Sequence, residues 1–551
     1  MAFTTFKLFR QARLYSIYVL ILLLIAYLLN QLDRYTLPIV AKPVAQDLKY
    51  GEKSCMANSS NYYYTNFKDN TSSTITHNCT HLLDDIKLNV TEQEKMCEGN
   101  SVLVNYTKNG TTYTNLTDAC EWNYDGSGLL YQVIAGPIFT VVYTFAGIPL
   151  GLAADRYNRV RILTVCLILW SFCTLMAGFA NAYWNLALAR MGLGIGEAGC
   201  SPMATSIIAD YFPEHLRGSA LGIYNFGIYT GYSLAFAIGN GVYLAIGWRW
   251  VFYIAAIPGF IFGIIIIISV KEPQRGQSND DNGKTVSGLK KKFQLPLRER
   301  VIELLKAFFL SPSVLLLCIA GGVRNGGGYV WALNTELFFE TVKEQTKTQI
   351  SHWMSWIPLV GGSIGAFVGG IISDVFVKKR GPHTRVWVLV ISQALAAPFA
   401  AGALFFNPPY CYLCLIPSNI IGEMWVGVTL AVLIDVVPVY LRTSAIAVYF
   451  FIITNIGGNL NPLVSVIKSS FGGGRTAYEY ALLIMYPGLY MLGSVLFLLT
   501  LFVLRIDIRR KKQREAEREA LFGYGNSDDD DEEITNSSEN KSDSDKIQRD
   551  L

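Results

Sequence analysis

A short motif, D-x-x-P-x-x-L-R-x-S-A, occurs twice in this chain of 551 residues, with about 225 residues between the two copies. The first copy consists of Asp210, Pro213, Leu216, Arg217, Ser219 and Ala220, and the second of Asp435, Pro438, Leu441, Arg442, Ser444 and Ala445. A looser pair occupies matching places after two apolar segments: Gly151, Asp155 and Arg159, then Gly370, Asp374 and Lys378. A chain that repeats itself at half its length in this way is typical of a duplicated membrane bundle.

Long apolar runs alternate with short charged segments over most of the chain. Hydrophobic residues make up 51% of the sequence and charged residues only 16%. Helical runs of about 20 apolar residues cross ~30 Å of hydrocarbon. Twelve such runs are found, at 14–37, 128–150, 161–181, 184–209, 217–244, 250–270, 308–333, 353–373, 386–406, 411–437, 442–467 and 479–504. We therefore expect an all-α membrane protein with twelve transmembrane helices in two six-helix pseudo-repeats. The first run is too long for a cleavable signal peptide.

The charged segments predict the domain organisation and the orientation. Lys and Arg gather at the N-terminus, in the 2–3 and 8–9 turns, in the linker after run six and after run twelve, so these segments are expected in the cytosol. The expected parts are a cytosolic N-terminus (1–13), a first half (14–270), a cytosolic linker (271–307), a second half (308–504) and a disordered cytosolic tail (505–551). The net charge of +4 then reflects membrane topology and not nucleic-acid binding.

The loop over residues 45–127 carries signs of a non-cytosolic compartment. Its N-x-S/T sequons lie at Asn58, Asn70, Asn78, Asn89, Asn105, Asn109 and Asn115. Such a concentration in one polar loop indicates a glycosylated segment. The same loop holds Cys55, Cys79, Cys97 and Cys120, which suggest two disulfides with three possible connectivities. Plasma membrane and lysosomal or late endosomal membrane both suit this loop.

Enzymatic chemistry has no candidate site in the sequence. Gly283-Lys284-Thr285 looks like the end of a phosphate-binding loop, but Ser278 stands where that motif needs glycine. No metal site and no cofactor are expected. Without an ATP site, uphill transport has to draw on a gradient.

Charged residues inside the apolar runs are the candidates for function, because charge in a membrane is costly. Run one contains Asp33 and Arg34, and run four contains Arg190 and Glu197, which share a helix face at a spacing of seven residues. Asp33 and Arg190 have similar depth and could pair. A carboxylate that alternates between an arginine and a proton is a coupling device; the alternative is a permanent structural salt bridge. Glu197 lies nearer the midplane and is the candidate to meet substrate.

The second half offers a comparable set. Arg324 and Asn325 lie in run seven beside three consecutive glycines, which would let the helix expose backbone to a cavity. Arg324 could bind an anionic headgroup, or it could be a structural partner for a polar group on run eight or eleven. Glu423 in run ten sits nearly where Glu197 sits in the first half.

The sequence G-L-A-A-D-R-Y-N-R-V-R at 151–161 resembles the 2–3 signature of the major facilitator superfamily, with Ala153 and Asn158 departing from the usual residues. The resemblance implies a cytosolic gate built from Gly151, Asp155, Arg156, Arg159, Gly370, Asp374 and Lys378. Within that superfamily, L-L-N-Q-L-D-R-Y-T-L at 28–37, R-M-G-L-G-I-G-E-A at 190–198 and I-I-A-D-Y-F-P at 207–213 resemble the spinster-like lipid transporters. This likeness implies that Asp33, Arg34, Arg190 and Glu197 are coupling and substrate residues.

We therefore expect an alternating-access secondary transporter, coupled to protons and functional as a monomer in the lipid bilayer. The expected substrate is a lysophospholipid or a sphingoid-type amphipathic lipid. A carrier of small organic ions is the alternative, because the long glycosylated first loop resembles the organic-ion branch of the superfamily. A transport-dead membrane receptor or sensor is a third hypothesis, and the gate motifs in both halves argue against it.

The topology is testable by deglycosylation. N-glycosidase treatment should lower the apparent mass of the membrane-expressed protein by several glycans, and Asn→Gln changes at all the sequons should abolish that shift. The gel shift measures the effect directly, because each occupied sequon adds a bulky glycan. If an antibody against residues 45–127 bound only from the cytosolic side, the predicted orientation would be inverted.

Overall fold

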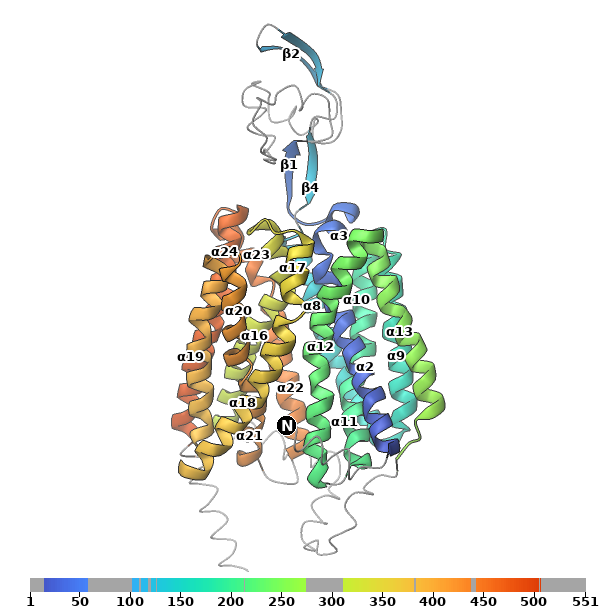
Figure 1. Cartoon of the computed structure of the whole chain (residues 1–551), viewed down its shortest axis with the longest axis vertical. Helices are drawn as coiled ribbons and strands as arrows, with labels where there is room; N and C mark the ends of the chain where they lie inside the picture. The colour runs from blue at the N-terminus through green and yellow to red at the C-terminus, as the bar shows by residue number, and fades with distance from the viewer. Residues whose placement is uncertain are drawn as a thin grey trace, which may run out of the picture.

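The computed structural model describes residues 14–57, 102–108, 111–116, 120–124, 126–212, 214–273, 311–380, 383–437, 442–504 and 506. Two helical halves stand side by side, and paired strands project from one end of the bundle (Figure 1). We call this end the strand end. Helix α2 (Leu14–Ile39) begins at the opposite end and is followed at the strand end by α3 (Ala41–Leu48). The predicted disordered tail and linker lie outside the described residues, apart from their first few positions.

The first half is built from helices that match runs one to six. They are α2, α7 (Leu129–Ala135), α8 (Pro137–Arg156), α9 (Arg159–Gly178), α10 (Tyr183–Ala198), α11 (Cys200–Tyr211), α12 (Glu214–Ile246) and α13 (Trp248–Ser269). Runs two and four are each divided into two helices. The breaks fall at Gly136, between α7 and α8, and at Gly199, between α10 and α11.

The second half repeats the pattern with runs seven to twelve. Its helices are α16 (Pro312–Thr341), α17 (Lys347–Met354), α18 (Ile357–Arg380), α19 (Thr384–Phe405), α20 (Tyr410–Gly422), α21 (Trp425–Val436), α22 (Arg442–Asn459), α23 (Leu463–Ser470), α24 (Gly474–Met485) and a final helix over 487–504. Run ten breaks at Glu423 and Met424, the counterpart of the break in run four. The twelve predicted runs are therefore all helical.

Nine helical segments in the described part of the chain are long and apolar enough to cross a membrane. The other three predicted spans are α10 with α11, α12, and α16. Each carries buried polar side chains, including Arg190 on α10, Asn240 on α12 and Arg324 on α16. Polar residues lower the mean hydropathy of a span. These three side chains are buried against other helices, where intramembrane polar and charged groups are usually found.

The strands belong to the predicted non-cytosolic loop. β1 (Lys53–Ala57) pairs antiparallel with β4 (Cys120–Tyr124), and β2 (Val102–Lys108) pairs with β3 (Thr111–Leu116). Cys55 lies opposite Trp122 and Cys120 opposite Ala57. Cys79, Cys97 and the sequons at Asn58, Asn70, Asn78, Asn89 and Asn109 lie outside the described residues, whereas Asn105 and Asn115 lie in β2 and β3. The six cysteines of the helical region are free thiols.

Buried amides join the two halves at the strand end. Gln132 of α7 donates from Nε2 to Asn334 Oδ1 of α16 at 2.6 Å and accepts from Asn461 Nδ2 at 2.6 Å. Tyr478 of α24 donates its hydroxyl to the same Asn334 oxygen at 2.8 Å. Next to this cluster, Gly136 approaches the carbonyl oxygen of Gly458 so closely that a Cβ would lie 2.7 Å away. Glycine at the break in run two therefore allows the backbones of the two halves to approach each other at this point.

A buried lysine adds a second contact between the halves at this end. Lys347 of α17 donates from Nζ to the carbonyl oxygen of Ile39 at 2.9 Å and to Glu336 Oε1 at 3.0 Å. Glu336 in turn accepts from Asn240 of α12 at 3.3 Å. Ile39 and Asn240 belong to the first half, whereas Lys347 and Glu336 belong to the second. The described contacts thus close the strand end.

Candidate functional site

The first buried ion pair joins the first and fourth runs of the first half. Arg34 of α2 donates to Glu197 Oε2 of α10 from Nε at 2.9 Å and from Nη2 at 2.8 Å. The Arg34 guanidinium also lies over the rings of Phe139 and Tyr143 from α8, at 5.0 and 4.9 Å. The Glu197 side chain is fully buried and that of Arg34 is 10% exposed. Two hydrogen bonds to one carboxylate oxygen and two aromatic faces therefore compensate the Arg34 charge, whereas Glu197 Oε1 is buried without a hydrogen-bond partner.

A matching pair joins the first and fourth runs of the second half. Arg324 of α16 donates from Nη2 to Glu423 Oε1 at 3.0 Å and to the carbonyl oxygen of Gly422 at 2.5 Å. Its Nε donates to Gln393 Oε1 at 2.9 Å. The guanidinium lies over the ring of Tyr490 at 4.5 Å. The break after α20 frees the Gly422 carbonyl to accept a bond from the arginine, since this carbonyl has lost the regular helical pattern.

The two pairs are pseudo-symmetric counterparts. In each half the arginine lies on the first run, the glutamate lies at or just before the break in the fourth run, and aromatic rings cover the guanidinium. The sequence predicted the correspondence of Glu197 with Glu423, but it did not predict either arginine partner. The first run of each half contains an arginine, Arg34 or Arg324, and this shared position could have suggested that each one pairs with the glutamate of its own half.

The expected contact between Asp33 and Arg190 is absent from the structure. Arg190 donates from Nη1 and Nη2 to the carbonyl oxygen of Arg34, at 3.3 and 3.4 Å. The Asp33 carboxyl is buried beside Trp170 and Thr174 of α9, and neither of its oxygens has a hydrogen-bond partner. Successive helical residues point about 100° apart, so Asp33 and Arg34 cannot both face α10. Arg34 takes that face, and the expectation of an Asp33–Arg190 pair was wrong.

Tyrosines connect each ion pair to the opposite half. Arg34 Nη1 lies 3.4 Å from the hydroxyl oxygen of Tyr329 on α16. Tyr229 of α12 donates its hydroxyl to Glu423 Oε2 at 3.2 Å. Both charged centres therefore lie at the boundary between the halves. Asn325 does not join them, because its Nδ2 donates to the carbonyl oxygen of Ile453 at 3.1 Å.

The predicted gate residues lie at the end opposite the strands. Gly151, Asp155 and Arg156 fall in the last turns of α8, and Gly370, Asp374 and Lys378 fall in α18. The side chains of Asp155, Arg156, Asp374 and Lys378 are outside the described residues. Arg159 begins α9 and is 3% exposed.

Arg159 ties three segments of the first half together at this end. It donates from Nη1 to Asp210 Oδ2 at 2.6 Å and from Nε to Glu272 Oε1 at 2.7 Å. Asp210 opens the repeated motif, so this copy of the motif supplies a partner for the 2–3 signature. Asn158, where the signature usually has glycine, caps α9 by accepting from the backbone N–H of Arg161 at 2.9 Å.

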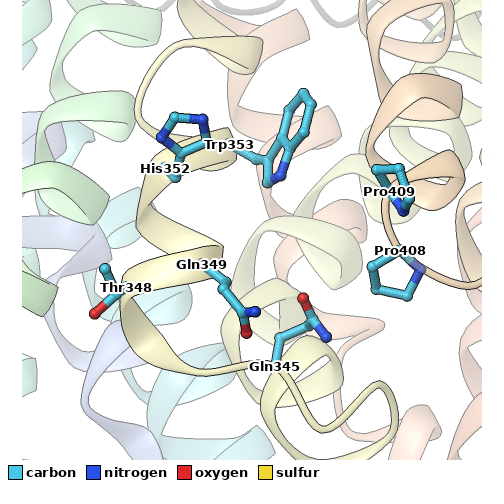
Figure 2. Close-up of a pocket in the computed structure, with 7 residues that line it drawn as sticks. All are labelled: Gln345, Thr348, Gln349, His352, Trp353, Pro408 and Pro409. Atoms are coloured by element: carbon cyan, nitrogen blue, oxygen red, sulfur yellow. The ribbon is translucent and has the colours of Figure 1, made fainter.

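A separate pocket opens on the second half at the strand end. It has a volume of about 580 Å³ and lies between the start of α17 and the turn before α20. Figure 2 shows its lining residues, Gln345, Thr348, Gln349, His352, Trp353, Pro408 and Pro409. None of these residues belongs to the ion pairs, so the pocket is distinct from the charged centres.

Comparison with known proteins identifies the family of this chain. A model of the Major Facilitator Superfamily matches residues 23–462. The chain belongs to this superfamily of secondary transporters, and it is not an enzyme. The predicted family and the predicted fold class are both confirmed.

Within the superfamily the chain is related to spinster proteins. It is 27% identical over 326 residues to Protein spinster of Drosophila melanogaster, a match that covers 58% of the chain and 50% of that relative. The chain thus spans about half the length of this relative. It is 25% identical over 430 residues to the sphingosine-1-phosphate transporter SPNS2 of Danio rerio, covering 72% and 80% of the two sequences.

A solved structure supports the fold. The crystal structure of a bacterial homolog to the human lysosomal transporter spinster, in an inward-facing and unoccupied conformation, aligns with a TM-score of 0.64. The alignment covers 90% of this chain and 98% of that chain at 22% sequence identity.

The two ion pairs differ in burial, and this difference predicts unequal effects on stability. Glu197→Gln leaves the buried Arg34 cation without its carboxylate, which should cost about 3–5 kcal/mol. Glu423 is 21% exposed, and Arg324 keeps Gln393 and the Gly422 carbonyl as acceptors, so Glu423→Gln should cost about 1–2 kcal/mol. Thermal unfolding of the detergent-purified variants compares them. A larger loss in Glu423→Gln would contradict the role assigned to burial.

Proposed function

We propose that this protein is a proton-coupled, alternating-access transporter of a lysophospholipid or sphingoid-type amphipathic lipid. The observation that carries the proposal is the pair of Arg–Glu centres, each bonded to a tyrosine of the opposite half. Ligands of transporters bind at the boundary between the repeats. A substrate that displaces these tyrosines acts on both halves at once, and it can therefore shift the balance between their two arrangements.

Recognition of an anionic headgroup is assigned to Arg34. Its side chain is 10% exposed, and a phosphate could take over the two hydrogen bonds that Glu197 Oε2 now accepts. Arg324 is less available, because Glu423, Gln393 and a backbone carbonyl already occupy its donors. Glu423, at 21% exposure, is placed to meet a cationic amine. This combination suits a headgroup that carries both a phosphate and an amine. The relative SPNS2 is a sphingosine-1-phosphate transporter, and its substrate is of this class.

Coupling to protons is assigned to Asp33, with Glu197 as the residue that meets substrate. Asp33 lies next to Arg34 in sequence, and a proton can bind its carboxyl without breaking an ion pair, since neither oxygen has a hydrogen-bond partner. When a headgroup binds Arg34, Glu197 loses its partner. A change of charge at either carboxyl then alters the energy of the other through their mutual repulsion.

The orientation follows from the predictions made on the sequence. We infer that the strand end faces the exterior or an organelle lumen, with the loop glycosylated and disulfide-bonded, and that both termini are cytosolic. The membrane is the plasma membrane or that of lysosomes or late endosomes. On this assignment the residues at 151–159 and 370–378 form the cytosolic gate. The protein is expected to function as a monomer.

Uptake into proteoliposomes at two pH values tests the function. A panel of lysolipids, sphingoid phosphates and small organic ions should show accumulation of a lipid, driven by a pH gradient. Accumulation of organic ions alone would support the alternative carrier, and transport of neither class at either pH would contradict a transport function.

The coupling residue has its own test. Asp33→Asn keeps the shape of the side chain and removes the titratable group, so it should abolish accumulation driven by a pH gradient while substrate exchange continues. Glu197→Gln should mainly weaken substrate binding. Glu344→Gln is the control, because this carboxylate is 68% exposed and lies outside the charged centres and the contacts between the halves.

Other outcomes would revise these roles. If Asp33→Asn retained full pH-driven transport and Glu197→Gln lost only the pH dependence, the two roles would be reversed. If neither variant changed the pH dependence, the protein would be a uniporter.

A further inference from the structure

The base of the first loop contacts both halves of the transporter at the strand end. We define the loop base as residues 46–52, which lead into β1, and residues 126–128, which follow β4. Both segments lie at the strand end (Figure 1), where the halves are closed, and α23 contacts them through Lys468. The loop base is therefore placed where the strand end has to open.

Contacts on one side fix the loop base to the first half. Asp47 accepts from Arg249 Nη1 and, at 3.2 Å, from Trp248 Nε1, both at the start of α13. Gln46 accepts from the backbone N–H of Tyr124 at 2.7 Å, which ties the base to β4. Gly126 has a φ of +74°, and an added Cβ would lie 3.2 Å from the backbone of Ala41. The loop base therefore moves with the first half.

On the other side, a buried lysine of the second half reaches the same loop base. Lys468 of α23 is 2% exposed, and its Nζ lies 2.6 Å from Glu52 Oε2. It also donates to Ser127 Oγ and lies 5.4 Å from the centre of the Tyr478 ring. Glu52 and Ser127 come from the two segments of the base, so one ammonium group holds both. A lysine that is buried in this way needs such partners, because an isolated charge is costly to desolvate.

We propose that the loop base is a latch of the strand-end gate, fastened by Lys468. Alternating access moves one half against the other around the central site. Since the base is fixed to the first half, opening of the strand end separates Lys468 from Glu52 and Ser127. The latch thus favours the state that is closed at the strand end, and it makes the first loop part of the gating apparatus. The proposal depends on alternating access and not on the substrate.

The chain provides a matched control within the second half. Lys343, after α16, has a side chain that is 7% exposed, an ion pair with Glu479 at 3.5 Å and a position 5.5 Å from the Phe338 ring. Lys468 has the same set of features: burial, a glutamate and an aromatic ring. The difference is that Lys343, Glu479 and Phe338 all belong to one half. Loss of Lys343 should therefore leave the equilibrium between the halves unchanged.

The test measures distances between the halves without substrate. Trp184 at the start of α10 and Phe471 after α23 would each be replaced by a noncanonical amino acid that carries a spin label. These two side chains are 72% and 57% exposed, and they belong to different halves. Pulsed electron resonance on the purified protein in nanodiscs then gives the populations of short and long distances. Lys468→Met should raise the ratio of open to closed molecules on the order of tenfold, a change of about 1.4 kcal/mol. Lys468→Arg and Lys343→Met should keep the ratio of the parent protein.

Two results would overturn the latch. One is an unchanged distance distribution in Lys468→Met, and the other is an equal shift in Lys343→Met, which would mean that any lost lysine loosens the strand end. If Lys468→Met failed to give a monodisperse protein, the double variant Glu52→Gln, Ser127→Ala would replace it. That variant changes side chains of the loop base and leaves α23 intact. It should raise the same ratio, and an unchanged ratio in it would overturn the proposal.

Discussion

The need to compensate buried charge is the constraint on which this structure depends. Arg34, Arg324, Glu197 and Glu423 lie in helices that cross a medium where an unpaired ion is costly. Each half meets this need in the same way, with an arginine on its first run bonded to a glutamate at the break in its fourth run. Aromatic rings complete the shell around each guanidinium. The pairs therefore fix how the first and fourth runs pack in both halves.

The contacts between the halves combine polar and apolar parts. One apolar core lies within each half, and another is shared by both halves, with Phe236 of α12 and Trp331 of α16 among its members. Hydrogen bonds of Gln132, Asn334, Lys347 and the two tyrosines at the ion pairs also cross the boundary. Water can replace such bonds when an interface opens, at a modest net cost for each bond. Exposure of the shared apolar core costs more, so this core favours the arrangement that is closed at the strand end.

The loop base extends the same logic beyond the membrane helices. Its contacts with the first half involve a backbone approach at Gly126 as well as side chains, whereas its contact with the second half depends on the ammonium group of Lys468. A contact based on one charged group is easily made and broken. The glycosylation and disulfides predicted for the loop would act on a segment that is already joined to the gate.

The sequence by itself determined the twelve runs, the division into two halves, the superfamily and the residues that carry charge inside the bundle. These features depend on composition and spacing, which the chain displays directly. The correspondence of Glu197 with Glu423 also followed from the spacing within each half. Both breaks beside these glutamates had a partial signal in a neighbouring glycine, Gly199 in run four and Gly422 in run ten.

Only the tertiary structure decided which charges meet. Asp33 and Arg34 are neighbours in sequence, and the rotation of α2 against α9 and α10 determines which of them faces Glu197. Depth along a helix can be estimated from sequence, but rotation depends on the packing of every surrounding side chain. For the same reason no sequence pattern predicted that Lys468 reaches Glu52, 416 residues away, since the closure of the two halves creates that contact.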